Sequence, residues 1–382
     1  MEFSFNPARG FGVYLHWPYC TRICPYCDFN VYAAKARDNA PLVEAMLADL
    51  SGWRERTGAR GVDTVFLGGG TPSLMAAEAV TRVLERIDAL WGIAPGAEIT
   101  LEANPDEAAR FGAFASAGVN RLSLGVQSMD DVQLKFLGRT HSAADAVAAY
   151  RAAEGKFRSV SIDMIYARPG QTLDDWRTEL APALALEADH LSLYELTIEP
   201  GAAFARAVKR GDWTPADDDA GADLYELTQE MTDRAGYLAY EVSNHARGTD
   251  HQSRHNRIYW ASGDWVGVGP GAHGRLTNGE RWAIEAAEKP DAYLHQVKAN
   301  GVGWSTVDRL DALAQARERV TMGLRVIEGL AVSDVEELGF VLDDAKLAEF
   351  AELGLLSYAN DRLALTVKGR LAADRIAAEI SP

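Results

Sequence analysis

The chain has 382 residues, of which 47% are hydrophobic and 24% are charged, and its formal net charge is -17. This acidity argues against nucleic acid as the main partner, because binding to phosphates needs a positive field. The chain begins with no basic segment followed by an apolar run, and no uncharged apolar stretch approaches the ~20 residues of a membrane helix. We therefore expect a cytoplasmic protein that makes no stable membrane insertion.

The first half of the chain alternates between strand-like and helix-like segments. The expected strands cover residues 12–17, 62–67, 98–103, 121–126, 160–166 and 190–196, and the expected helices cover residues 41–55, 76–90, 108–117, 143–154 and 172–186. A repeated β/α unit predicts a parallel sheet covered by helices. In such folds the functional residues gather at the carboxyl ends of the strands.

The second half is less regular. A looser stretch at 200–216 precedes an expected helix over 219–235, a strand over 238–243, a polar loop over 247–257 and a glycine-rich stretch over 261–275. Beyond residue 306 we expect helices over 310–324 and 343–353, a helix beginning near Ser333 and Asp334, a hairpin turning at 360–362 and a final helix over 367–380. This pattern predicts two domains, residues 1–300 and 306–382, the second similar to a winged helix. Its mixed charges do not form the basic stripe of a DNA-binding domain.

The three cysteines of the chain, Cys20, Cys24 and Cys27, lie together in a C-x3-C-x2-C pattern. Thiolates at this density bind zinc or an iron–sulfur cluster. Three cysteines leave one iron of a [4Fe–4S] cluster without a protein ligand. That open iron suits a small molecule that chelates through an amine and a carboxylate, such as S-adenosylmethionine (SAM). Zinc needs a fourth ligand, and His16 is the nearby candidate.

Polar or glycine-rich motifs follow several of the expected strands. The stretch Gly68 to Pro72, GGGTP, lets the backbone approach a ligand, although a tight turn before a helix is the alternative interpretation. Glu102, in EANP, is placed to accept hydrogen bonds from ribose hydroxyls. Gln127, Arg139 and Asp163 occupy similar positions after later segments. A bound nucleoside would give these polar groups partners.

Together with Tyr26 before the third cysteine, these motifs resemble the radical SAM superfamily, in the branch that contains oxygen-independent coproporphyrinogen oxidase and the haem chaperone HemW. The resemblance implies an α/β fold, a partial (β/α)6 TIM-like barrel with a small winged-helix-like C-terminal domain. It also implies a [4Fe–4S] cluster on the three cysteines, with Tyr14 and Tyr26 beside it. The implied SAM site comprises Gly69, Gly70, Thr71, Glu102, Gln127, Arg139 and Asp163, with weaker matches at Thr197 and near His273.

Two features separate the members of this branch. Phe29 stands where the oxidase carries a further cysteine, and residues 255–260 read H-N-x-x-Y-W, a string similar to the signature of the haem chaperones. Histidine is a good axial ligand of haem iron, and aromatic rings can pack on a porphyrin. We therefore predict that His255 binds haem iron; a structural histidine is the alternative. The rival haem ligands are His141, His245 and His251.

Three hypotheses follow. The first is a haem chaperone that holds haem and a SAM-ligated cluster and delivers haem to a recipient haemoprotein, such as one of the respiratory chain, from the cytoplasm or the membrane periphery. The second is a radical SAM enzyme that decarboxylates the propionates of a porphyrinogen. The third is a zinc-stabilised binding module. Arg168 is expected either to contact a porphyrin propionate or to point to solvent. A monomer and a dimer are both compatible with the sequence.

Overall fold

The computed structural model describes residues 9–34 and 39–382, so most of the N-terminal stretch from which we expect no signal peptide lies outside the described residues. A twelve-stranded mixed sheet forms the centre of the molecule, in the order β14-β13-β12-β11-β1-β4-β5-β6-β7-β8-β10-β9. Its strands are β1 (Phe11–Trp17), β4 (Val62–Gly69), β5 (Ile93–Ala103), β6 (Arg121–Gln127), β7 (Ser159–Tyr166), β8 (His190–Glu195), β9 (Leu238–Ala239), β10 (Asn244–Ala246), β11 (Asp264–Val268), β12 (His273–Asn278), β13 (Glu280–Ala286) and β14 (Trp304–Leu310).

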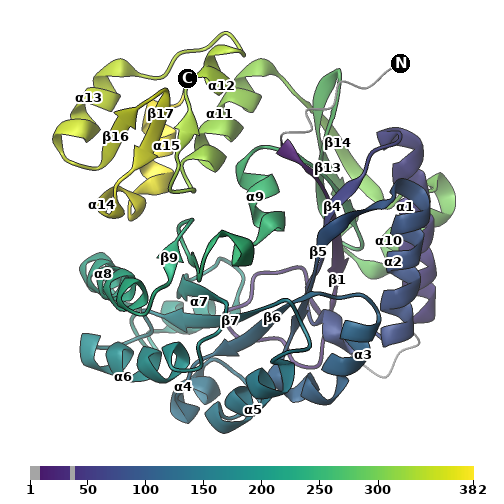
Figure 1. Ribbon diagram of the computed structural model, residues 1–382, viewed down its shortest axis with the longest axis horizontal. Helices are drawn as coiled ribbons and strands as arrows, with labels where there is room; N and C mark the ends of the chain where they lie inside the picture. Colours follow the sequence, from purple (N-terminus) through teal and green to yellow (C-terminus); the bar gives the residue numbers. More distant parts are fainter. Residues whose placement is uncertain (1–8, 35–38) are drawn as a thin grey trace.

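The strands from β11 to β8 in that order run parallel, as the alternating β/α pattern predicts. The larger helices of this half cover the outer face of the sheet (Figure 1). The helices of the first 300 residues are α1 (Ala40–Thr57), α2 (Ala77–Trp91), α3 (Phe111–Ser116), α4 (Asp131–Phe136), α5 (Ala143–Ala153), α6 (Leu173–Leu184), α7 (Ala203–Arg210), α8 (Asp218–Arg234), α9 (Arg254–Trp260) and α10 (Pro290–Asn300). Short 3-10 turns occupy Pro72–Leu74, Pro105–Arg110 and Thr249–His251.

The register of the parallel strands brings polar residues together on the inner face. Ser161 is the register partner of Ser123 on one side and of His190 on the other. Asp163 lies between Gly125 and Ser192 in the same way. Side chains two residues apart on a strand share a face, so these rows form one polar surface opposite the apolar face that the helices cover.

Several expectations for residues 200–260 are wrong. The loose stretch contains the helix α7, and the expected strand over 238–243 is replaced by the two short antiparallel strands β9 and β10. The expected polar loop contains α9. This helix begins because the Ser253 side chain accepts from the Asn256 N–H at 3.3 Å and the buried Glu98 carboxylate accepts from the Arg254 and His255 N–H groups. Glu98 is distant in sequence, so the local pattern does not reveal it.

The last 70 residues pack around a second hydrophobic cluster that includes Leu324, Phe350 and Ile376. Their elements are the helices α11 (Ala312–Gly323), α12 (Ser333–Glu336), α13 (Asp344–Glu352), α14 (Val367–Arg370) and α15 (Ala373–Ile380) and the strands β15 (Leu330–Ala331), β16 (Leu356–Ala359) and β17 (Arg362–Leu365). The hairpin is present, and both Asn360 and Asp361 have positive φ, which is typical of a type I′ turn. This separate cluster supports the proposed division into two domains.

The expected single helix over 367–380 is instead two helices, α14 and α15, because the chain leaves helical geometry at Ala372. Beyond this break, Ile376 and Ile380 reach the second hydrophobic cluster. The small domain lies beside α9 (Figure 1), and its helix α11 also reaches the edge of the main sheet, where Glu318 pairs with Arg275 of β12 and Arg281 of β13. No helix in the described part of the chain is long and apolar enough to cross a bilayer.

Candidate metal and cofactor site

A cavity of about 540 Å³ opens at the carboxyl ends of the parallel strands. We call it the cysteine cavity, because Cys20, Cys24 and Cys27 line it together with residues of the inner polar surface. All three cysteines are free and partly buried. The loop that carries them is closed by a short parallel pair, β2 (Tyr19–Cys20) with β3 (Tyr32–Ala33). The cysteine triplet therefore lies where the alternating β/α pattern predicts the functional residues.

Tyr26 anchors the cysteine loop to neighbouring apolar side chains. It packs on a small apolar cluster that includes Phe204, with 6.4 Å between the two ring centroids. The Phe204 N–H donates to the Pro25 carbonyl at 2.8 Å, and the Cys27 N–H donates to the Cys24 carbonyl at 3.2 Å. The loop is thus held in place by contacts other than its thiols, and the thiols remain free to bind a metal.

Arg139 connects the cysteine loop to two strand ends. Its guanidinium donates to Cys24 Sγ at 3.4 Å, to the Gly125 carbonyl at 3.0 Å and to the Asn104 side chain. Burial raises the pKa of Cys20, and it raises the pKa of Cys27 to about 12. These cysteines are therefore neutral thiols at neutral pH without a metal, and metal binding would release protons. A positive charge beside the sulfur atoms would favour their thiolate form.

The donor set fits an iron–sulfur cluster better than a single zinc ion. Among the described residues, no three Cys, His, Asp or Glu side chains converge closely enough to hold one metal ion. His16, the candidate fourth zinc ligand, is buried and uses its two ring nitrogens on the Tyr14 hydroxyl and the Asn30 carbonyl. A [4Fe–4S] cluster takes one thiolate at each iron, so its ligands need not meet at a point.

The Gly68 to Pro72 loop packs closely against β1 and β2, with no room for side chains at two of its glycines. A Cβ at Gly69, whose φ is +104°, would lie 2.6 Å from the His16 ring, and a Cβ at Gly70 would lie 2.7 Å from the Tyr19 carbonyl oxygen. The N–H groups of Gly69, Gly70 and Thr71 all donate within the protein. The glycines are therefore required by packing. Gly69, Gly70 and Thr71 also line the cysteine cavity, so a ligand there would meet their other atoms.

Glu102 and Asp163 are acids in the wall of the cysteine cavity. Burial and the charge of Asp163 raise the pKa of Glu102 to about 8, although its carboxylate accepts from the Gly69 N–H at 3.0 Å. Burial also raises the pKa of Asp163, which accepts from Ser123 and Ser161 at 2.6 and 2.8 Å. Among the described residues neither acid forms an ion pair, so the two favour a ligand that brings a positive charge, such as a sulfonium or an ammonium group.

The other predicted SAM-site residues occupy different places. Gln127 lines the cavity with φ of 68°, a strained conformation for a residue with a side chain, at a register shift between β6 and β7. Thr197 lies exposed on the rim. Tyr14 is not among the residues that line the cavity; its ring lies near Phe66, at 6.2 Å between centroids. His273 is 61% exposed on β12 and does not line the cavity.

Sequence reasoning missed a buried polar network in the wall of the cysteine cavity. Ser161 contacts His190 Nδ1 at 2.8 Å, and His190 Nε2 contacts the Tyr240 hydroxyl at 2.8 Å. That hydroxyl accepts from the Ser253 N–H at 3.0 Å, immediately before α9. The signal in the sequence is the period-two serines of the buried strands, which place polar side chains on the face opposite the helices.

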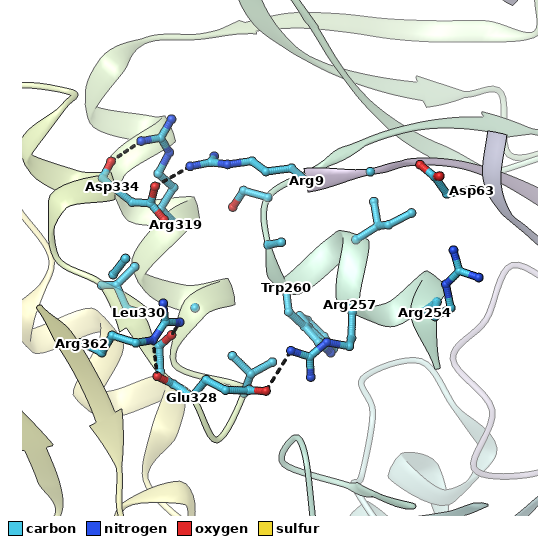
Figure 2. Close-up of a pocket in the computed structure, with 18 of the residues that line it drawn as sticks. Arg9, Asp63, Arg254, Arg257, Trp260, Arg319, Glu328, Leu330, Asp334 and Arg362 are labelled. Atoms are coloured by element: carbon cyan, nitrogen blue, oxygen red, sulfur yellow. Dashed lines mark hydrogen bonds and ion pairs between the residues drawn. The ribbon is translucent and has the colours of Figure 1, made fainter. Parts of the chain in front are cut away.

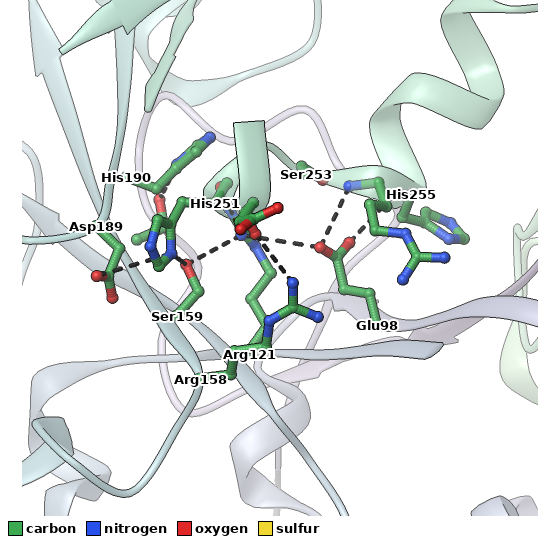
Figure 3. Close-up of polar contacts among 12 residues, drawn as sticks. Glu98, Arg121, Arg158, Ser159, Asp189, His190, His251, Ser253 and His255 are labelled. Atoms are coloured by element: carbon green, nitrogen blue, oxygen red, sulfur yellow. Dashed lines mark hydrogen bonds and ion pairs between the residues drawn. The ribbon is translucent and has the colours of Figure 1, made fainter. Parts of the chain in front are cut away.

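A buried ion pair also holds α9. Arg121 lies 3.8 Å from Glu98, whose carboxylate accepts from the first N–H groups of α9. Arg121 also donates to the His251 carbonyl at 2.8 Å and lines the cysteine cavity (Figure 3). The start of α9 is therefore fixed to the inner face of the sheet by the ion pair and by the serine–histidine–tyrosine network.

His255 lies on α9 but not at a cavity surface. It is 1% exposed, and its ring nitrogens contact Thr64 Oγ1 and the Tyr259 hydroxyl, each at 2.7 Å. Burial lowers its pKa to about 3, so the ring is neutral. Iron ligation by His255 stays a prediction, and it requires one of these contacts to open. The rivals His141 and His245 are also buried, and His251 contacts Ser159 and Asp189.

Both expectations for Arg168 are wrong. The side chain is 2% exposed and forms an ion pair with Glu179, which also accepts from the Ser128 hydroxyl and, at 3.2 Å, from the Met129 N–H. A buried guanidinium needs a carboxylate. Glu179 on α6 supplies it, and a local motif cannot show this. Arg168 therefore holds the segment after β7 against α6.

These features define an α/β protein with three cysteines grouped in a cavity at the carboxyl edge of a parallel sheet. A family model described as the radical SAM superfamily matches residues 14–180, and the HemN C-terminal domain matches residues 310–372. A Mycobacterium tuberculosis protein named heme chaperone HemW is 38% identical over 97% of this chain and 94% of its own length. The Escherichia coli protein of the same name is 42% identical over 69% of this chain and 70% of its own.

A bovine relative, named radical S-adenosyl methionine domain-containing protein 1, mitochondrial, is 39% identical over 85% of this chain and 76% of its own length. Among solved structures, coproporphyrinogen III oxidase (HemN) from Escherichia coli aligns with a TM-score of 0.82 and 23% identity over 97% of this chain and 89% of its own, which shows the shared fold. The chain belongs to the HemW family of the radical SAM superfamily. Membership implies a [4Fe–4S] cluster and SAM.

Proposed function

We propose that this protein is a haem chaperone, which holds haem together with a SAM-ligated [4Fe–4S] cluster and passes the haem to a recipient haemoprotein. The observation that carries the proposal is the position of α9. This helix contains the H-N-x-x-Y-W string and begins directly after Ser253. Ser253 and Asn256 of the helix both line the cysteine cavity, so α9 forms part of its wall. The relatives named heme chaperone HemW support the haem assignment.

In this proposal Cys20, Cys24 and Cys27 hold the cluster, and its open iron is the place for the amine and carboxylate of SAM. The cluster and SAM would supply electron transfer and, when SAM is cleaved, radical chemistry. Arg139 would offset negative charge beside Cys24, to which it donates at 3.4 Å. Glu102 would meet the cationic or hydroxyl-bearing part of SAM, because its pKa of about 8 falls when a positive charge arrives.

The enzyme alternative, oxidative decarboxylation of a porphyrinogen, shares the cluster and SAM. The position of Phe29 argues against it. This side chain is 59% exposed and lines the cysteine cavity, where the resemblance gives the oxidase a further cysteine. An apolar side chain cannot ligate iron, so a role of that extra thiol in turnover is lost here.

The experiment is anaerobic reconstitution with iron and sulfide, followed by a haem titration monitored by absorbance. We expect stoichiometric haem binding, with a shifted or weaker Soret band in His255→Ala. His295→Ala is the control, since this histidine lies on α10, away from α9. A protein that holds its cluster and converts coproporphyrinogen III, but binds no haem, would contradict the chaperone proposal and establish the enzyme.

A further inference from the structure

A second cavity, of about 740 Å³, lies on the other side of α9, between this helix and the small C-terminal domain. Five arginines line it, from both parts of the molecule: Arg9, Arg254, Arg257, Arg319 and Arg362 (Figure 2). We call it the arginine cavity. Three acids line it as well, Asp63, Glu328 and Asp334, so arginines outnumber acids five to three. An excess of positive charge in a chain of net charge -17 indicates a site for an anion.

The ion pairs of this cavity leave part of the positive charge available. Arg257 pairs with Glu328 at 2.9 Å, and Arg9 pairs with Asp334 at 2.5 Å. Among the described residues, Arg254 has no carboxylate partner; it is exposed and donates to the Gly96 carbonyl at 2.8 Å. Arg362 contacts backbone carbonyls of residues 328 and 329 only, within the described part of the chain. The guanidinium groups lie on several sides of the opening in Figure 2.

The rest of the lining is apolar and partly aromatic. Ile258 and Trp260 come from α9, and Val326 and Leu330 come from the segment that leads into the small domain. Trp260 is held by its indole N–H, which donates to Glu241, and by Arg325, whose Cζ lies 5.2 Å from the ring. A cavity with an apolar wall and separated arginines fits a large, flat, apolar molecule that carries more than one carboxylate.

The two cavities beside α9 differ in which charge they accept. Five acids line the cysteine cavity, Asp28, Glu102, Asp163, Glu195 and Glu199, against three arginines, Arg22, Arg121 and Arg139. Apart from a carboxylate bound to the cluster iron, the carboxylates of a ligand would be repelled there and attracted in the arginine cavity. Thr64, which contacts His255 Nδ1 at 2.7 Å, lines the arginine cavity, so this histidine lies one side chain away from it.

We infer that the arginine cavity is the site that receives the propionate groups of the porphyrin, with Arg254 and Arg362 as their main contacts. This inference rests on the proposed haem-carrier function and adds where the acidic edge of the porphyrin binds. In this arrangement α9 lies between the propionate groups and the SAM site. The class of ligand is a flat tetrapyrrole dicarboxylate.

The test compares Arg254→Glu with Arg206→Glu. Both arginines are exposed, and each donates to one backbone carbonyl, Gly96 for Arg254 and Gly201 for Arg206. Binding of haem and of iron-free protoporphyrin is measured by tryptophan fluorescence at fixed salt, with thermal unfolding as a check of folding. We expect Arg254→Glu to weaken both ligands about tenfold or more, and Arg206→Glu to leave them unchanged. If Arg254→Glu is unfolded, Arg254→Gln replaces it and should show a smaller loss.

Binding of the dimethyl ester of protoporphyrin distinguishes the contribution of the carboxylate charges from that of the shape of the ring. The ester lacks carboxylates, so we expect the wild type and Arg254→Glu to bind it equally. Equal binding of protoporphyrin by the Arg254 variants and the wild type would overturn the inference while leaving the carrier function intact. Displacement of protoporphyrin by inorganic phosphate at equal concentration would show a general anion site and also overturn it. A wild type that binds neither haem nor protoporphyrin would overturn both proposals.

Discussion

The cysteine cavity and the arginine cavity share one wall, the helix α9, yet they are built in opposite ways. The cysteine cavity lies at an edge of the parallel sheet. Most of its residues come from the cysteine loop and from successive strands between residues 20 and 199, and Asn244, Ser253 and Asn256 complete it. The arginine cavity is formed where two hydrophobic clusters meet, from residues as distant as Arg9 and Arg362. The first carries an excess of acids and thiols and suits a cation and a metal cluster. The second carries an excess of arginines and suits an anion.

The difference shows how one short helix can serve two ligands of opposite charge. Asn256 of α9 lines the cysteine cavity, whereas Arg254, Arg257 and Ile258 line the arginine cavity. His255 points into the interior between them. A ligand in either cavity therefore contacts the helix that carries the H-N-x-x-Y-W string. Substitutions in α9 and in the residues that hold it should thus affect both cavities.

The largest expected effect concerns the thiols. Cys20→Ser should abolish cluster assembly, because two thiolates cannot replace three and the chain has no other cysteine. Iron and sulfide content after anaerobic reconstitution should fall to background, while protoporphyrin binding in the arginine cavity persists. Asp28→Asn, in the same loop, is expected to keep its iron. A Cys20→Ser protein with a full complement of iron and sulfide would contradict the cluster assignment.

The next effect concerns the shared wall. Glu98→Gln leaves Arg121, which is 4% exposed, without its carboxylate and weakens the hydrogen bonds that start α9. We expect the free energy of unfolding to fall by about 3 kcal/mol. Urea unfolding measures it. The matched control is Glu78→Gln at an exposed position of α2, where we expect a change within about 0.5 kcal/mol. Equal stability of the two variants would show that Glu98 does not hold α9.

A third prediction sharpens the acidic side of the comparison. The pKa of Glu102 is about 8 in the folded protein and 4.5 is its ordinary value, so between these pH values the folded protein holds a proton that the unfolded chain has lost. The stability of the metal-free wild type should therefore fall, relative to Glu102→Gln, as pH rises from about 4.5 to 8 and then level off. We expect a difference of about 1 kcal/mol, since the carboxylate lies at the wall of an open cavity.

Thermal or urea unfolding of both proteins across this pH range checks the third prediction. The exposed Glu85 supplies the control, and Glu85→Gln should follow the wild type at every pH. Parallel curves for the wild type and Glu102→Gln would show that burial does not raise the pKa of this carboxyl.

The smallest expected effect is on the basic side. Glu328→Gln removes the partner of Arg257 from an ion pair whose side chains are 35% and 43% exposed. We expect a loss of stability below about 1 kcal/mol, because such pairs are well solvated. The arginine excess rises, so protoporphyrin should bind more tightly, with a steeper dependence on salt. Weaker porphyrin binding by Glu328→Gln would argue that the ion pair itself shapes the site.

The sequence alone determined the features that depend on local spacing. The three cysteines within eight residues, the alternating strand and helix patterns, and the motifs after the strands place the cysteine cavity at one edge of a parallel sheet, because parallel strands bring their carboxyl ends together. This rule alone is enough to bring Cys20, Glu102 and Asp163 together in the cysteine cavity.

Only the tertiary structure decided the rest, since those features depend on partners far away in the chain. Glu98 starts α9 where the sequence predicts a loop, and Glu179 buries Arg168 where the sequence suggests a propionate or solvent. The burial of His255 and the opposite charges of the two cavities arise in the same way. A buried charge or ring takes the partner that packing supplies, and sequence spacing does not contain that partner.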